Sequence, residues 1–166
     1  MATNSSNLSP SARTKNSFQQ LAQAAKNLNS VSDELAKPVE SLDAGLKKLN
    51  LGVTAWTAME EGQDEFKPEY WWSRDIGYAK IGGKWGIALR TVSGDDRAPG
   101  YEKVEEWLFS DAPRWLRVTG IEHVPALIGK LIEETNKTAA RIKERISDAQ
   151  ELAAAVDELA AGAKKR

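Results

Sequence analysis

The sequence predicts an α+β protein in which a four-stranded antiparallel β-meander is flanked by two long amphipathic helices. The first observation is that all six tryptophans, and eleven of the twelve aromatic residues, lie between Trp56 and Trp115, with only Phe18 outside. The second is that the apolar residues of both flanks recur at alternating spacings of three and four, which is typical of helices. An aromatic-rich head at residues 51–120 is therefore expected between two aliphatic helices.

The N-terminal flank contains one unbroken apolar seam in which Ser32 is the only polar member. Its ten positions are Phe18, Leu21, Ala25, Leu28, Ser32, Leu35, Val39, Leu42, Leu46 and Leu49. A period of 3.5 residues places these side chains on one face, which must be buried against another helix. We expect a helix over residues 15–50, about 54 Å long, after a polar lead-in at residues 1–14 that is expected to be disordered.

The C-terminal flank, residues 121–166, shows a second seam of ten positions. They are Ile128, Ile132, Thr135, Ala139, Ile142, Ile146, Ala149, Ala153, Val156 and Ala160. This predicts a helix of about 57 Å that begins near Pro125. The matched lengths suggest that the two helices pair within the chain as an antiparallel coiled-coil-like hairpin, and the alternative is that they pair between chains.

A two-residue turn at Gly82-Gly83 predicts the central hairpin of the head, because both central positions of a type I′ turn need positive φ. Pairing outward from this turn predicts one bulky apolar face and one nearly flat face. On the bulky face we expect the pairs Lys80–Trp85, Tyr78–Ile87, Ile76–Leu89 and Arg74–Thr91; on the flat face we expect Ala79–Gly86, Gly77–Ala88 and Asp75–Arg90. Outer strands are expected at residues 53–60 and 103–109.

The flat strip of small residues permits two interpretations: a long helix packs across it, or it forms a binding groove. Asp75 and Arg90 are correspondingly either a cross-strand ion pair or a polar anchor for a ligand. After the last strand, Ser110 or Asp111 is expected to cap a short helix that ends near Gly120. The basic end Lys164-Lys165-Arg166 is interpreted as a solvated helix terminus, with an anion or nucleic-acid contact as the alternative.

Composition disfavours several classes of function. With 23 basic and 24 acidic residues there is no overall field to hold nucleic acid, and no apolar run is long enough to cross a membrane. The chain has no cysteine and a single histidine, His123, and no spacing typical of a catalytic, metal or cofactor site is found. We therefore predict a non-enzymatic, cytoplasmic protein without a cofactor.

Trp71 and Trp72 are adjacent, so strand alternation sends them to opposite faces of the sheet. One of the two rings should therefore be left for recognition, and Trp71, Trp72, Arg74 and Arg90 form the candidate site for a partner or ligand. The alternative is that these rings cover the junction between sheet and helices. The predicted function is a protein-interaction or assembly module that self-associates through its long helices; the alternative is a small-ligand-binding domain that uses the Trp/Arg face.

Overall fold

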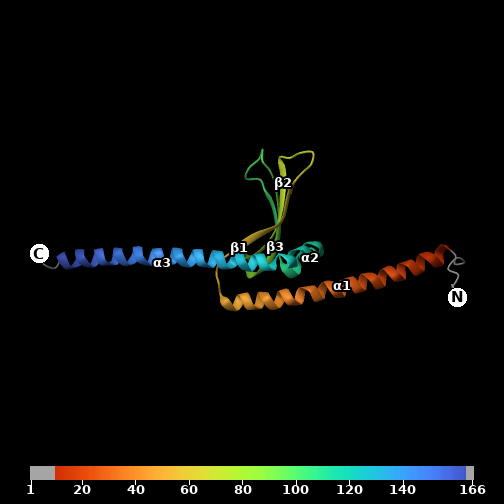
Figure 1. Ribbon diagram of the computed structural model, residues 1–166, viewed down its shortest axis with the longest axis horizontal. Helices are drawn as coiled ribbons and strands as arrows, with labels where there is room; N and C mark the ends of the chain where they lie inside the picture. Colours follow the sequence, from red (N-terminus) through yellow and green to blue (C-terminus); the bar gives the residue numbers. More distant parts are fainter. Residues whose placement is uncertain (1–9, 164–166) are drawn as a thin grey trace.

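The computed structural model describes residues 10–163 and has the predicted α+β architecture (Figure 1). In chain order the elements are α1 (Pro10–Leu49), β1 (Ala55–Gln63), β2 (Tyr70–Ile81), β3 (Lys84–Asp95), β4 (Lys103–Leu108), the 3-10 turn η2 (Phe109–Asp111), α2 (Arg114–Glu122) and α3 (Val124–Ala163). Helix α1 begins before the predicted start at Lys15, so the lead-in is shorter than expected. The rest of the predicted lead-in, residues 1–9, and the basic end lie outside the described residues.

The four strands form one antiparallel sheet in the order β1-β2-β3-β4, which is the predicted meander. Gly82 and Gly83 make the central turn with φ of 55° and 84°. All seven predicted cross-strand pairs between β2 and β3 are confirmed. The two glycines were sufficient to predict these pairs, because a two-residue turn fixes the register of the two strands that it joins.

The bulky face of the sheet forms the core together with parts of all three helices. Its central side chains, Ile76, Tyr78, Ile87 and Leu89, are almost completely buried. The helices contribute Val39 and Leu46 from α1, Leu116 from α2, and Leu127 and Leu131 from α3. Only the C-terminal part of α1 and the N-terminal part of α3 therefore pack against the head.

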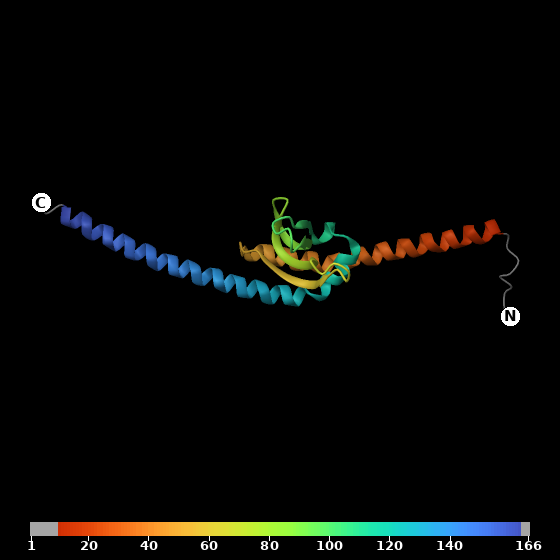
Figure 2. The ribbon, with the colours of Figure 1, turned by 90° about the horizontal axis from the view of Figure 1, so that it is seen from above.

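The prediction that the two long helices pair along their length within the chain is wrong. Helices α1 and α3 run in the same direction, and their outer parts extend to opposite sides of the head (Figures 1 and 2). The N-terminal end of α1 and the C-terminal end of α3 consequently lie at opposite ends of the molecule. The physical reason is that the sheet core fixes each helix through its inner segment, and the matched lengths carried no information about that docking.

Outside these docked segments, large apolar side chains in and beside the predicted seams are exposed in the part of the chain that the structure describes. In α1 the side chains of Phe18, Leu21, Leu28 and Val31 are more than half exposed. In α3 the same holds for Ile142, Ile146, Leu152, Val156 and Leu159. We call residues 10–31 the α1 arm and residues 139–163 the α3 arm.

Helix α2 links the head to α1, and its start differs from the prediction. It begins at Arg114 after Pro113 as N-cap, without a side-chain cap, because Ser110 and Asp111 lie in the preceding 3-10 turn. Arg117 Nη2 donates to the buried Ser32 Oγ at 3.1 Å. This bond gives the single polar residue of the α1 seam, Ser32, a hydrogen-bond partner at the point where the docked segment begins.

Candidate functional site

Three tryptophans of the sheet lie over glycines on neighbouring strands. The register pairs Trp56 with Gly77, Trp72 with Gly62, and Trp71 with Gly94. A Cβ added at any of these glycines would lie 2.7 Å or less from the indole ring. Each glycine therefore provides the space in which a tryptophan lies flat on the sheet, an arrangement that stabilises strand register.

The flat strip is neither crossed by a helix along its length nor left open. The Trp56 indole covers Gly77, and Leu108 of β4 reaches the position above Gly86. Helix α1 approaches the strip only through Asp43, whose carboxylate oxygens would lie 3.2 and 3.4 Å from a Cβ at Gly86. Side chains from the two edge strands thus fill most of the space that both sequence interpretations assigned to another element or a ligand.

Asp43 has a structural role that the sequence pattern did not indicate. Its Oδ1 accepts a hydrogen bond of 2.8 Å from the backbone N–H of Ile87, and its Oδ2 lies 2.6 Å from Lys47 Nζ. The pairing of β3 with β4 ends at Ala88 and Leu108, so Ile87 lies just beyond the end of the ladder. A carboxylate from α1 therefore satisfies an edge donor of β3 and locks the helix to the sheet.

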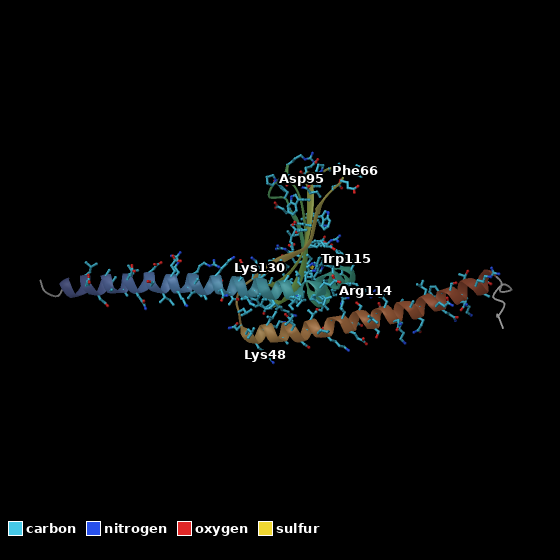
Figure 3. All side chains as sticks on the ribbon, in the orientation of Figure 1. Lys48, Phe66, Asp95, Arg114, Trp115 and Lys130 are labelled. Carbon is cyan, nitrogen blue, oxygen red and sulfur yellow. The ribbon has the colours of Figure 1, made fainter. Side chains whose placement is uncertain are left out.

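Arg74, one of the four predicted site residues, makes several contacts within the chain. Its guanidinium carbon lies 4.6 Å from the ring centroids of both Trp72 and Trp115, and Nη1 donates to Glu60 Oε2. Trp115, labelled in Figure 3, belongs to α2 and is about half exposed. The stack therefore joins the sheet to α2, and cation–π attraction contributes to that junction.

Arg90 is engaged in the same way on the other face of the sheet. Its guanidinium carbon lies 4.2 Å from the Trp56 ring centroid, and its Nε donates to Asp75 Oδ2 at 2.7 Å. Asp75 is buried, so its carboxylate needs this partner. The interpretation of Asp75 and Arg90 as a cross-strand ion pair agrees with this geometry.

The four candidate residues consequently do not converge on one site. Trp72 and Arg74 share the face that carries α2, whereas Trp71 and Arg90 lie on the opposite face. Both arginines are held by tryptophans and carboxylates of the same chain. Trp71 and Trp72 both contribute to an open surface, a hollow of about 370 Å³ that they line with Tyr70 and Tyr101.

The sheet tip, made of the β1–β2 and β3–β4 loops, carries exposed aromatic residues that sequence reasoning missed. Phe66 is 89% and Tyr101 86% exposed, and Phe66 and Asp95 lie at the end of the sheet farthest from the helices (Figure 3). These exposed rings could have been predicted from their position in turn-rich loops, because the end of a hairpin has no neighbouring element that would bury them. We call Phe66, Tyr70 and Tyr101 the tip aromatics.

An ion-pair cluster fixes the backbone of this tip. Arg97 contacts Asp95 at 3.0 Å and Glu69 at 3.0 Å, and its guanidinium lies 5.5 Å from the Tyr70 ring. Hydrogen bonds from the Arg97 side chain and backbone hold the pKa of Asp95 at about 2, below its ordinary 3.8. The turn that follows Asp95 is thus closed by an arginine.

Within residues 10–163 no group of three or more His, Cys, Asp or Glu side chains could hold a metal ion. His123 lies at the junction of α2 and α3, where its Nδ1 is 3.1 Å from the carbonyl oxygen of Thr119. None of the described helices has both the length and the apolar character needed to cross a membrane.

Comparison of the chain with protein-family models, with curated proteins and with solved structures gives no match.

Proposed function

We propose that this protein is a non-enzymatic assembly module that self-associates through its two helical arms. The observation that carries the proposal is the pair of exposed apolar seams, which continue along α1 and α3 well beyond the docked segments. Phe18 at 71% and Leu21 at 64% exposure are large apolar side chains of the α1 seam, and Val156 at 55% belongs to the α3 seam. Contiguous exposed apolar rows of this length mark association surfaces in soluble proteins.

Helix energetics support the same proposal. An isolated helix gains little from propensity alone, and most helical stability in proteins comes from packing of an amphipathic face. The α1 arm would extend about 33 Å from the head without such packing. A partner helix packed against the α1 arm would bury the exposed part of the α1 seam, which includes Phe18, Leu21 and Leu28.

Ligand binding by the head is the second candidate function. The tip aromatics offer a more open binding surface than the Trp/Arg face that the sequence predicts. Arg74 and Arg90 each stack on a tryptophan and pair with a carboxylate of the same chain, whereas Tyr70, Trp71 and Tyr101 line an open hollow together with Lys103. Exposed rings beside a cation are suited to contact with another protein or a planar ligand. Loss of binding after Tyr101→Ala, with the mass in solution unchanged, would support this candidate.

The proposal is tested by the mass of the chain in solution. Light scattering should give a mass that rises with concentration to at least twice the 18.2 kDa of one chain. Ile146→Glu with Val156→Glu should reduce that mass to one chain. Both residues are exposed in the single chain, so the change should cost little of the free energy of unfolding of the head.

Ser147→Glu with Ala154→Glu is the matched control. It adds the same charge on the opposite side of α3, at 100° per residue, and should leave the mass unchanged. A wild-type mass of 18.2 kDa at all accessible concentrations would contradict the proposed self-association.

A further inference from the structure

We infer that the partner of each arm is the opposite arm of a second copy, so that two chains exchange α1 and α3 arms in an antiparallel, two-fold dimer. This inference rests on the proposed self-association and specifies its geometry. Helices α1 and α3 run in the same direction, and their arms leave the head on opposite sides (Figures 1 and 2). A two-fold axis perpendicular to the long axis of the molecule therefore reverses the direction of both helices in the second copy. This rotation brings the α1 arm of each copy beside the α3 arm of the other.

The symmetry makes the assembly closed. The same contact occurs twice, once on each side of the paired heads, and no seam is left over at the ends of the dimer. A head-to-tail arrangement, in which arms pair in parallel, would satisfy the same seams but would continue as an open filament. Charge and side-chain volume discriminate between the two.

Charge along the arms favours the antiparallel arrangement. The α1 arm carries Arg13, Lys15 and Lys26 and no acidic residue. In the outer part of the α3 arm, residues 146–163, all four charged residues are acidic: Asp148, Glu151, Asp157 and Glu158. Antiparallel pairing places the basic outer end of the α1 arm beside this acidic outer end, where opposite charges attract across a coiled-coil interface.

Parallel pairing would have the opposite effect. The inner part of the α3 arm contains Arg141, Lys143 and Arg145 with a single acidic residue, Glu144. A head-to-tail contact would place the basic outer end of the α1 arm against this basic segment. Like charges facing each other across such a seam select against the arrangement.

Side-chain volume leads to the same choice. When the arms overlap fully in antiparallel register, the seam pairs are Phe18 with Ala153, Leu21 with Ala149, Ala25 with Ile146, and Leu28 with Ile142. Bulky residues thereby face small ones along most of the seam, as interdigitation requires. Full overlap in parallel would set Phe18 against Ile146 and leave Ala25 against Ala153, crowding one layer and emptying another.

Cysteine crosslinking tests the arrangement directly, since the natural chain has no cysteine. Leu28→Cys with Ile142→Cys should form an interchain disulfide in nearly all chains under mild oxidation, because antiparallel pairing brings these positions within disulfide reach. Leu28→Cys with Val156→Cys is the matched control, since only parallel pairing joins residues 28 and 156. We expect its crosslinked yield to be about tenfold lower.

The outcomes separate this inference from the proposal on which it rests. A dimeric mass with efficient crosslinking of residues 28 and 156 would overturn the antiparallel exchange while leaving self-association intact. A monomeric mass for the wild-type chain would defeat both. A dimeric mass without crosslinking in either pair would also overturn the exchange of arms, because every full overlap of the arms joins residue 28 to one of the two positions.

Charge reversal provides a second, independent readout. Arg13→Glu with Lys15→Glu should weaken self-association about tenfold or more, and so should Asp157→Lys with Glu158→Lys in a separate chain, because the antiparallel register places these two pairs of residues side by side. Mixing the two variants should restore wild-type affinity, because each arm pair of the mixed dimer again joins opposite charges. Failure of the mixture to associate would show that the α1 arm does not meet the α3 arm.

Discussion

Gly77→Ala tests whether the Trp56 ring fixes the geometry of the sheet. A Cβ at residue 77 would lie 2.3 Å from Trp56 Cε3 and 2.6 Å from the carbonyl oxygen of Ala55. Ordinary contacts begin near 3.4 Å, so both a ring and a backbone atom must move by about 1 Å. No rotation of a flexible side-chain end relieves the backbone contact.

The magnitude of the effect follows from what must move. Forcing an extra carbon into a closed site costs about 1–3 kcal/mol. Displacing Trp56 also weakens its contact with Arg90, which contributes about 0.5–1 kcal/mol at a partly exposed site. The lower entropy of the unfolded alanine chain offsets about 0.5–1 kcal/mol. The last two contributions cancel, so we expect a net loss of about 1–3 kcal/mol in the free energy of unfolding, measured by urea denaturation.

Two further glycines serve as controls. Gly86→Ala would place its Cβ 3.1 Å from Leu108 Cδ2 and 3.2 Å from Asp43 Oδ1, both ends of side chains that can shift, so we expect a loss below about 1 kcal/mol. Gly45→Ala lies in α1 with nothing within 4 Å and should stabilise the protein by about 0.5–1 kcal/mol. A Gly77→Ala variant with wild-type stability, or one less affected than Gly86→Ala, would refute the role given to the Trp56 ring.

Three other predictions concern the head. Asp43→Ala should cost about 1–3 kcal/mol in the free energy of unfolding and remove the hydrogen-exchange protection of the Ile87 amide. Asp43→Asn keeps a hydrogen-bond acceptor and should lose less stability and less protection. Equal protection of the Ile87 amide in both variants would contradict the role given to the hydrogen bond between Ile87 and Asp43. Trp72→Ala, which removes a ring that covers a glycine and stacks on a guanidinium, should cost about 2–3 kcal/mol in denaturation. The lowered pKa of Asp95 means that its ion pair with Arg97 is complete above pH 3.8 and is lost as the pH falls through about 2. An NMR titration of the Asp95 carboxyl should show this midpoint, and Arg97→Ala should return it to near 3.8; an unshifted midpoint in the wild type would contradict the ion pair.

The parts of the fold that the sequence predicted are those governed by local chemistry. The hairpin register followed from Gly82-Gly83, and both helices followed from their seams, with Asn50 ending α1 in the left-handed conformation at φ 47°. The order of the strands also followed, because short turn-rich connections leave few alternatives to a meander.

The direction of the helices was not predictable from periodicity. A seam records that a helix face is buried but not against which element, and the inner half of each seam packs against the sheet while the outer half does not. The same limit applied to the candidate site. The small residues Gly77 and Gly86 were identified as a flat strip, but the register of β1, which places Trp56 over Gly77, depends on a bulge between Ala58 and Glu60 that no sequence signal marked.

Hydrogen exchange as a function of concentration tests most directly whether the arms, and not the head, carry association. Amides of the α1 arm and the α3 arm should be weakly protected in dilute solution and should gain protection together as the concentration rises. Amides of the sheet, residues 55–108, should keep the same protection throughout, because the core is complete within one chain. Protection that rises at the tip aromatics while the arms remain unchanged would contradict the account and place the interaction surface on the head.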